Sequence, residues 1–426
     1  MGGAMETRFR AWLPLALAGA LALLLAACAG GAPEGTPTKP PITIGATYDA
    51  TGATANVGVP LKTGWEDYIN LVNSKGGVDG HPINLINIEH GYEVPKGVDA
   101  YEQVKRQGAV MFLAYGTPIV AALSDRCNAD KIPCLTPGFG IAAAANGEKY
   151  PYIFPMAASY WSQAGAAVKF ILNQWQKEGR PGKPKIAFLA IDNPAGREPL
   201  GVLEELQRRE GLELRSFFIP LPGTDVSAQA TDIVRRYQAD WTIWHLFGVT
   251  PAAAVRAWKD VGAPLNRVVS LFGASGTDEY TGVGGMSAVE GLYGTQVFNF
   301  GSEVPIAREL KQLYQDEGRA APDLIGNSRW YWFGVFKAAL MVSGLRQALE
   351  KEGWPLTGEK VKRGLESVRG NVDGVVSVNM SPQDHEGGGQ VRVYQVRQGR
   401  WQPATDWFTA YRDIIIEVAR REVGAR

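Results

Sequence analysis

The sequence predicts an α/β protein with two doubly wound parallel-sheet lobes. From Ile42 onward, short apolar strands alternate with helices of about three turns, an order that is typical of parallel βαβ units. The alternation breaks at Tyr150–Gln163, where prolines and aromatic residues interrupt it, and it then starts again. The length of 426 residues also exceeds what one typical hydrophobic core holds. Each half of the chain should therefore form its own sheet.

The first half begins with the strand-like segment ITIGATY at Ile42, and INLINIE, AVMFLAY and IPCLTP follow it. Between these segments, apolar residues recur at helical spacing. The predicted helices are Pro60–Ser74, which the glycine pair after it ends, Val98–Gln107 and Ile119–Asn128.

The second half repeats this plan with the strand-like segments PKIAFLAID, LELRSFFIP, WTIWHLF and RVVSLFG. Its predicted helices are Ala164–Lys177, Glu198–Glu210, Ala228–Gln238 and Pro251–Val261. The strand GLYGTQVF and a β-rich tail ending at Trp401 complete the pattern. The last predicted helices are Ile306–Glu317, Arg329–Leu349, Glu359–Ser367 and the terminal Asp406–Glu422.

The beginning of the chain has the pattern of a bacterial export signal. Arg8 and Arg10 precede the apolar run Ala11–Ala27, which is marginal for a spanning helix. Leu25-Ala26-Ala27-Cys28 fits the lipobox of lipoproteins, in which the signal is cut before an acylated cysteine. We therefore expect a signal peptide over residues 1–27, lipidation of Cys28 and a flexible linker over residues 28–41. An uncleaved signal anchor is the alternative.

Composition excludes several classes of function. The formal net charge is zero, so there is no electrostatic case for nucleic-acid binding. The apolar content is that of a globular protein rather than a membrane channel. No metal site is expected, because neither HExxH nor CxxC occurs and the histidines have no metal-ligand spacing. These histidines are His81, His90, His245 and His385.

Cys127 and Cys134 are the cysteines that remain after Cys28. In an exported chain they can oxidise to one disulfide, which would close a short loop between a helix end and a strand start. Two buried free thiols are the alternative.

Ligands of open parallel sheets bind beyond the carboxyl ends of the strands, so the loops there are candidate sites. After AVMFLAY, Gly116 lets the backbone turn, Thr117 can cap the next helix and Pro118 fits its first turn. A helix that begins here could bind an anion at its N-terminus. Plain helix capping without a ligand is the alternative.

The next strand ends in TPGFGIAAA, where Gly138 and Gly140 expose backbone and Phe139 offers an apolar face. This GxGxxA is not on the first βα unit, and no acidic residue ends a strand about 20 residues later. No nucleotide or other cofactor is therefore expected.

In the second half, the corresponding loops are IDNPAGRE, HLFGVTP and FGASGTDEY. Aromatic residues on or near them can belong either to the core or to a pocket. Phe247, at the end of its strand, is the best placed for a ligand.

The order of these features resembles the branched-chain amino-acid-type substrate-binding proteins of ABC importers. The resemblance runs from Ile42 to about Trp401 and rests on IGATYDATGATANVGVPLKTGWEDYINLVNSKGGVDGHPINLI, YGTP…AALSD, IPCLTPG, DNPAGRE and ADWTIWHLFG. It implies the class I periplasmic-binding fold, in which two lobes joined by a three-crossover hinge close over a ligand. The crossovers would lie near Pro155–Tyr160, Val297–Gly301 and Gly374–Met380.

These crossovers divide the chain into lobes. Lobe 1 would comprise residues 42–157 and 298–376, and lobe 2 residues 158–297 and 377–405. Residues 406–426 would form a C-terminal helix.

The resemblance also places ligand contacts on individual residues. The loop that holds the ligand carboxylate falls on Thr117 and Pro118, and the next contacts fall on Gly138, Phe139 and Gly140. In the second lobe, a frequent aromatic falls on Ala195, the next aromatic on Phe247, and the acid that holds the α-ammonium on Ser275. Tyr48, Tyr92 and Tyr160 lie on other cleft-side loops and complete the candidate set.

The departures at Ala195 and Ser275 bear on the ligand. A buried ammonium needs a carboxylate, so the sequence favours a small carboxylate, amide or related polar solute over leucine, isoleucine or valine. The alternative is an amino acid whose ammonium meets another acid. The candidates for that acid are Asp278, Glu279, Asp49 and Glu93.

The predicted function is that of a lipid-anchored, extracytoplasmic monomer that captures a small solute and delivers it to ABC permease subunits. A sensor subunit of a membrane signalling protein is an alternative that the sequence does not separate from it. An anchored hydrolase is disfavoured, because GASGT at Gly273–Thr277 lacks the last glycine of GxSxG. We therefore expect a binding protein and not an enzyme.

Overall fold

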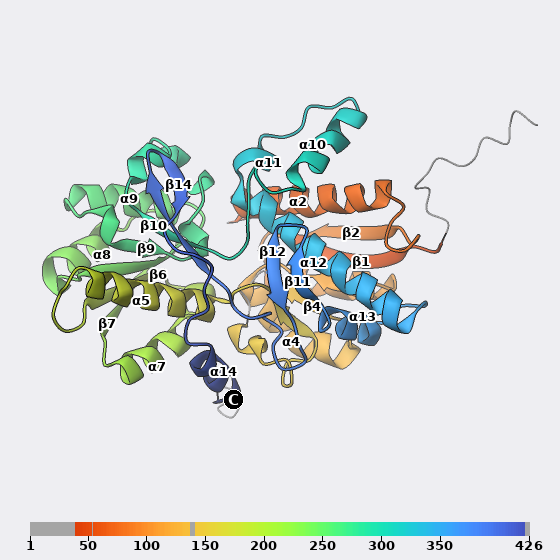
Figure 1. Ribbon diagram of the computed structural model, residues 1–426, viewed down its shortest axis with the longest axis horizontal. Helices are drawn as coiled ribbons and strands as arrows, with labels where there is room; N and C mark the ends of the chain where they lie inside the picture. Colours follow the sequence, from red (N-terminus) through yellow and green to blue (C-terminus); the bar gives the residue numbers. More distant parts are fainter. Residues whose placement is uncertain (1–38, 53, 137–140, 422–426) are drawn as a thin grey trace, which may run out of the picture.

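The computed structural model describes residues 39–52, 54–136 and 141–421, and it contains two α/β lobes side by side (Figure 1). Lobe 1 is built on a five-stranded sheet and lobe 2 on a seven-stranded sheet. The predicted fold class is confirmed. The predictions for residues 1–38, which include the signal peptide, Cys28 and most of the linker, lie outside the described residues.

The sheet of lobe 1 has the order β2-β1-β3-β4-β5, and its neighbouring strands are parallel. These strands are β1 Ile42–Tyr48, β2 Ile83–Glu89, β3 Phe112–Leu113, β4 Cys134–Thr136 and β5 Ile153–Pro155. The helices between them are α2 Ala55–Ser74, α3 Val94–Arg106 and α4 Thr117–Asp130, with a short 3₁₀ turn at Ala142–Ala145. A disulfide between Cys127 and Cys134 joins α4 to β4.

The sheet of lobe 2 has the order β14-β13-β10-β9-β8-β6-β7 and is parallel except at β13 and β14. Its strands are β6 Lys185–Ile191, β7 Glu213–Ile219, β8 Trp241–His245, β9 Val268–Ser270, β10 Tyr293–Gln296, β13 Arg392–Arg397 and β14 Arg400–Pro403. Its helices include α5 Tyr160–Lys177, α6 Pro194–Arg197, α7 Leu200–Glu210, α8 Ser227–Thr231 and α9 Thr250–Asp260.

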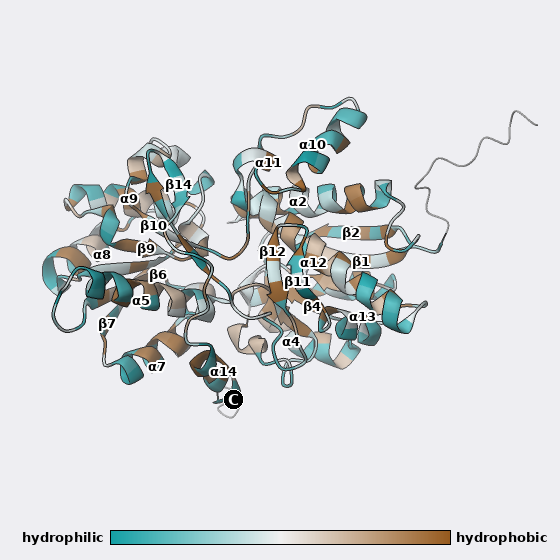
Figure 2. Cartoon of the chain, viewed as in Figure 1, coloured by the Kyte–Doolittle hydropathy of each residue, from teal (hydrophilic) through white to brown (hydrophobic). Residues whose placement is uncertain are grey.

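Strand β6 is largely hydrophobic, whereas the edge strand β14 and helix α10 Ala307–Asp316 are largely hydrophilic (Figure 2). In β6, the sequence KIAFLAI is buried at every position after Lys185. A continuous apolar run of this kind is expected of a parallel strand that is covered by helices on both faces.

The chain segment after β10 returns to lobe 1. It forms α10 Ala307–Asp316, α11 Leu324–Asn327, α12 Arg329–Glu352, α13 Gly358–Leu365 and the hairpin of β11 Arg369–Val372 and β12 Val376–Asn379. Helix α12 packs against α2 across lobe 1, and its beginning points toward lobe 2 (Figure 1).

The chain passes between the sheets at 156–159, at 297–306 and at 380–391. The last passage lies beyond the expected Gly374–Met380, because residues from Val376 to Asn379 form β12. Its partner strand β11 lies in the same hairpin, so the chain leaves lobe 1 only after that hairpin is complete.

The terminal helix is shorter than the predicted Asp406–Glu422. Helix α14 spans Arg412–Arg421. The residues before it are extended, because Phe408 and Val391 exchange backbone hydrogen bonds of 2.9 Å in an antiparallel bridge.

Candidate functional site

A cavity of about 30 Å³ lies between the two lobes. Loops after the parallel strands of both sheets line it, which is where such folds bind ligands. The beginnings of α2, α5 and α12 complete its wall. The lining residues are Thr54, Val57, Tyr92, Tyr115, Gly116, Thr117, Tyr160, Ala195, Phe247, Gly273 and Trp330.

The wall from lobe 1 centres on the beginning of α4. Gly116 has φ 97°, a conformation that favours glycine, and it occupies the position before the helix. Helix α4 therefore starts at Thr117, whose side chain makes no capping hydrogen bond. The prediction that Thr117 caps the helix is wrong. Instead, its hydroxyl oxygen is buried at the cavity, and no residue in the described part of the chain forms a hydrogen bond with it.

His90 fixes the loops on this side of the cavity. Its Nδ1 accepts from the Tyr92 backbone N–H at 2.9 Å, so its Nε2 carries the proton and donates to the Tyr115 carbonyl oxygen at 3.2 Å. Burial is the main cause of a lowered pKa of His90, which keeps the ring neutral. Burial likewise raises the pKa of Tyr92 to about 12, so its phenol stays protonated.

The wall from lobe 2 is arranged around His245, which is buried behind the lining residues. Its Nε2 donates to the Ala195 carbonyl oxygen at 2.9 Å, and burial lowers the pKa of His245 to about 4. Its ring meets Tyr160 and Phe247 edge-on, with centroid distances of 4.2 and 6.0 Å. A neutral imidazole therefore positions three lining residues on this side.

A charged pair lies behind the part of the cavity wall that Trp330 forms. Trp330, which lines the cavity, donates from Nε1 to Glu279 Oε1 at 2.8 Å, and Glu279 forms an ion pair with Arg329. None of the described residues that line the cavity has a charged side chain.

The structure brings five of the predicted ligand residues together around this cavity. They are Thr117, Ala195, Phe247, Tyr92 and Tyr160. Gly138, Phe139 and Gly140 lie outside the described residues.

Three other candidates do not line the cavity. Pro118 is in the first turn of α4, next to the lining residue Thr117. Ser275 is fully buried, and its hydroxyl donates to the carbonyl oxygens of Ser270 and Leu271 at 3.1 and 2.8 Å. Tyr48 packs under Lys62, whose Nζ lies 5.4 Å from the centroid of the Tyr48 ring.

Sequence reasoning missed several lining residues. Thr54, Val57 and Tyr115 lie in or beside loops that were recognised, but their direction was not evident from the pattern. Gly273 lies in FGASGTDEY, a loop that the pattern does mark as a candidate, but nothing in the pattern distinguishes it from its neighbours. Trp330 is brought to the cavity by long-range packing, for which the local sequence carries no signal.

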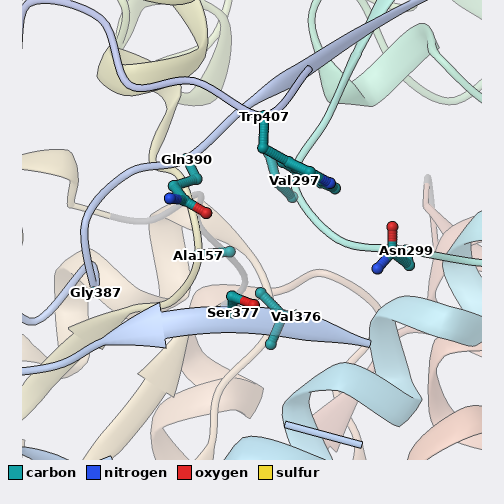
Figure 3. Close-up of a pocket in the computed structure, with 8 residues that line it drawn as sticks. All are labelled: Ala157, Val297, Asn299, Val376, Ser377, Gly387, Gln390 and Trp407. Carbon is teal, nitrogen blue, oxygen red and sulfur yellow. The ribbon is translucent and has the colours of Figure 1, made fainter. Parts of the chain in front are cut away.

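A second cavity, of about 40 Å³, lies at the passages between the lobes. Figure 3 shows Trp407 on one side and Val376 and Ser377 of β12 on the other. All three chain passages contribute to it or border it, so it belongs to the hinge region. The other lining residues are Ala157, Val297, Asn299, Gly387 and Gln390.

The described part of the chain has neither a metal-binding cluster nor a membrane-spanning helix. No group of three or more His, Cys, Asp or Glu side chains there could hold a metal ion. No helix within residues 39–52, 54–136 and 141–421 is long and apolar enough to cross a membrane.

A family model described as periplasmic binding protein matches residues 41–400. The chain belongs to this family. Members of the periplasmic binding protein family are extracytoplasmic substrate-binding components of ABC transporters rather than enzymes, and they bind small molecules and interact with ABC permeases. The resemblance to the branched-chain amino-acid-type proteins is confirmed.

Solved structures of similar fold agree with this membership. One, described as an ABC transporter permease from the Pseudomonas fluorescens group, is 30% identical with a TM-score of 0.81, covering 90% of this chain and 96% of its own. A branched-chain amino acid ABC transporter protein from Thermus thermophilus with bound valine is 21% identical, with a TM-score of 0.75 and coverages of 90% and 99%.

A fatty acid ABC transporter substrate-binding protein from Thermomonospora curvata is 19% identical, with a TM-score of 0.74 and coverages of 92% and 96%. At these two lower identities, the likeness shows the fold alone. No curated protein matches this periplasmic binding protein in sequence.

Proposed function

We propose that this chain is the lipid-anchored solute-binding component of an ABC importer of the branched-chain amino acid/amide type. It captures a small polar organic solute between its lobes and delivers it to the permease as a monomer. The observation that carries the proposal is the Thr117 hydroxyl, which is buried in the interlobe cavity and has no hydrogen-bond partner among the described residues. A buried hydroxyl of this kind is unfavourable unless a ligand or water supplies its hydrogen bond.

The chemistry of the cavity favours a ligand without a free ammonium group. The described lining residues offer hydroxyl groups, backbone and aromatic rings, and none of them carries a carboxylate. Asp49 accepts from the Thr54 backbone and hydroxyl at 2.8 Å each, and Glu93 pairs with Lys96 on the surface. A small carboxylate or amide therefore fits better than an amino acid, which would bury an unpaired charge.

Mass spectrometry of the small molecules released from purified, denatured protein tests the capture of a solute. We expect one dominant small carboxylate or amide that rebinds to the stripped protein. Purified protein that releases no such molecule, and that binds none from panels of acids, amides and amino acids, would contradict the proposal.

The anchor is tested separately at Cys28. We propose that acyl chains on this cysteine hold the protein at the membrane, since two or more chains give stable anchoring. Cys28→Ala should leave the protein unprocessed or release it from the membrane fraction. Acyl chains on the variant, or none on the wild type, would refute the anchor and leave solute binding untouched.

We also propose that the lobes move as two bodies about the chain passages. Lobe 1 would comprise residues 42–157 and 298–379, and lobe 2 residues 158–297 and 392–405. Support comes from the hinge cavity, where Asn299 of one passage bonds through its backbone and side chain to Val375 and Gly374 beside β12.

A further inference from the structure

Polar contacts join the lobes beside the cavity, between the beginning of α12 and the loop that follows β9. Arg329 forms an ion pair with Glu279, and Trp330 donates to the same carboxylate oxygen at 2.8 Å. The Arg329 guanidinium also donates to the Gly273 carbonyl oxygen at 3.5 Å. These four residues form the interlobe clasp.

Further contacts hold the same two segments together. Ser328 donates to Asp278 at 2.8 Å, and Thr277 donates to the Asn327 carbonyl oxygen at 3.0 Å. Helix α12 packs on α2 of lobe 1, whereas the 3₁₀ segment Asp278–Val283 packs on α9 of lobe 2. The clasp therefore crosses from one lobe to the other.

The ion pair of the clasp is enclosed. The side chains of Arg329 and Glu279 are 0% and 1% exposed. The guanidinium carbon lies 4.2 and 4.3 Å from the ring centroids of Phe272 and Trp330. Removing one partner of a buried pair is strongly destabilising, so in the closed protein each charge requires the other.

The clasp reaches the ligand cavity through Trp330 and Gly273, which both line it. Glu279 is thus an acidic side chain bonded directly to a residue of the cavity wall. Arg329 and Trp330 both bond to Oε1 of Glu279, whereas its Oε2 has no hydrogen-bond partner among the described residues. Because the Arg329 guanidinium neutralises the carboxylate, Glu279 presents no net negative charge to a ligand ammonium.

We propose that Arg329 determines the ligand specificity of this protein: by occupying Glu279, it makes the closed cavity select an organic acid or amide without a free ammonium group. The proposal rests on the proposed function. An apolar residue in place of Arg329 would free the Glu279 carboxylate, and a ligand ammonium would then supply the partner that closure requires. A ligand without an ammonium would leave Glu279 buried and unpaired.

Calorimetric titration with two matched pairs of acids tests this assignment. Leucine and 4-methylpentanoate differ only in the α-ammonium, as do phenylalanine and 3-phenylpropanoate. The wild type should bind the deaminated acid of a pair more tightly. Arg329→Met should shift the affinity ratio toward the amino acid by about tenfold or more, because an unpaired buried carboxylate is costly.

Two variants serve as matched controls. The double variant Glu279→Gln/Arg329→Met also lacks the guanidinium but leaves no free carboxylate, so it should keep the wild-type preference. Arg329→Lys keeps a cation beside Glu279 and should keep it as well. Circular dichroism checks that each variant folds. If Arg329→Met does not fold, Glu279→Gln is used as the test variant in its place. In Glu279→Gln the Arg329 guanidinium has lost its carboxylate partner, so this variant should disfavour the amino acid even more strongly than the wild type does.

The proposal is overturned if the wild type prefers the amino acid of either pair, or if Arg329→Met binds neither amino acid. An unchanged ratio in Arg329→Met, or an equal gain in the double variant, overturns it as well. A wild type that releases a small molecule but shows one of these results contradicts the role of Arg329 alone. A wild type that releases none and binds none of the four acids contradicts the proposed function.

Discussion

The Thr117 hydroxyl is the residue-scale feature on which ligand binding depends most directly. It is buried at the cavity and has no partner within residues 39–52, 54–136 and 141–421, because Gly116 takes the capping position in which the hydroxyl would have been used. Thr117→Val removes this hydroxyl at nearly constant shape. We expect it to weaken binding of the released solute by about 0.5–3 kcal/mol, the range for an unpaired polar group.

Calorimetry on the stripped protein measures the loss at Thr117, with Thr117→Ser as the control that keeps the hydroxyl. Phe247→Ala should also weaken binding, through lost apolar contact at the cavity. Unchanged affinity in both Thr117→Val and Phe247→Ala would place the ligand elsewhere in the cleft.

Lys337 should make the stability of the folded protein depend on pH. It is fully buried in α12, its Nζ donates to the Ala114 carbonyl oxygen at 2.7 Å, and burial lowers its pKa to about 7 from 10.5. Between these values the unfolded chain binds a proton that the folded chain does not. The free energy of unfolding therefore rises with pH there, by at most about 1.4 kcal/mol per unit.

Lys337→Met removes this dependence. The free energy of unfolding of the variant should exceed that of the wild type by the largest amount below pH 7. This difference in unfolding free energy should shrink as the pH rises toward 10. Denaturant titrations of both proteins from pH 6 to pH 9 measure the difference in unfolding free energy. A difference that does not change with pH would show that Lys337 keeps one charge state in both forms.

Cavity-lining residues in the loops after parallel strands could be predicted, because the fold brings these loops together at one edge of each sheet. Thr117 and Phe247 were found in this way, and Ala195 was found through the family resemblance. Ser275 was predicted from that resemblance, but its hydroxyl bonds to the backbone carbonyl oxygens of Ser270 and Leu271, and the residue does not line the cavity. Trp330 was not predicted, because only the packing of α12 on α2 brings it to the site.

At the scale of elements, the crossing of α2 and α12 sets the position of the Trp330 wall. The backbones approach closely at Gly334, where a β-carbon would overlap the Leu61 carbonyl oxygen. Gly334→Ala should therefore destabilise the protein by about 1–3 kcal/mol, since overpacking forces the helices apart. Denaturant unfolding followed by tryptophan fluorescence measures this change.

Gly282 provides the matched control for this substitution. A β-carbon there would meet no atom within 4 Å, and the residue is exposed. Gly282→Ala should leave the midpoint of unfolding near that of the wild type. An equal midpoint for Gly334→Ala would mean that the two helices are not in the close contact described.

The alternation of strands and helices was predictable from local apolar spacing, but some boundaries were not. Helix α14 starts at Arg412 because Phe408 pairs with Val391, a contact between segments that no local pattern reveals. The hairpin of β11 and β12 likewise keeps the chain in lobe 1 beyond the expected crossover. Both differences arise from pairings that form only in the folded chain.

For the whole molecule, the arrangement of two sheets with the chain passing repeatedly between them implies a hinge. A ligand that contacts both walls of the interlobe cavity stabilises the closed form by its difference in affinity for the two forms. The clasp and the ligand would then favour the same closed arrangement, because both lie between the same two surfaces.

Small-angle X-ray scattering on the stripped protein, with and without the solute released from it, tests the central claim that a ligand is held by closure of the two lobes. The radius of gyration should fall when the solute saturates the protein and should rise again when the solute is removed. A radius of gyration that stays the same at saturation would contradict closure and point to a preformed site.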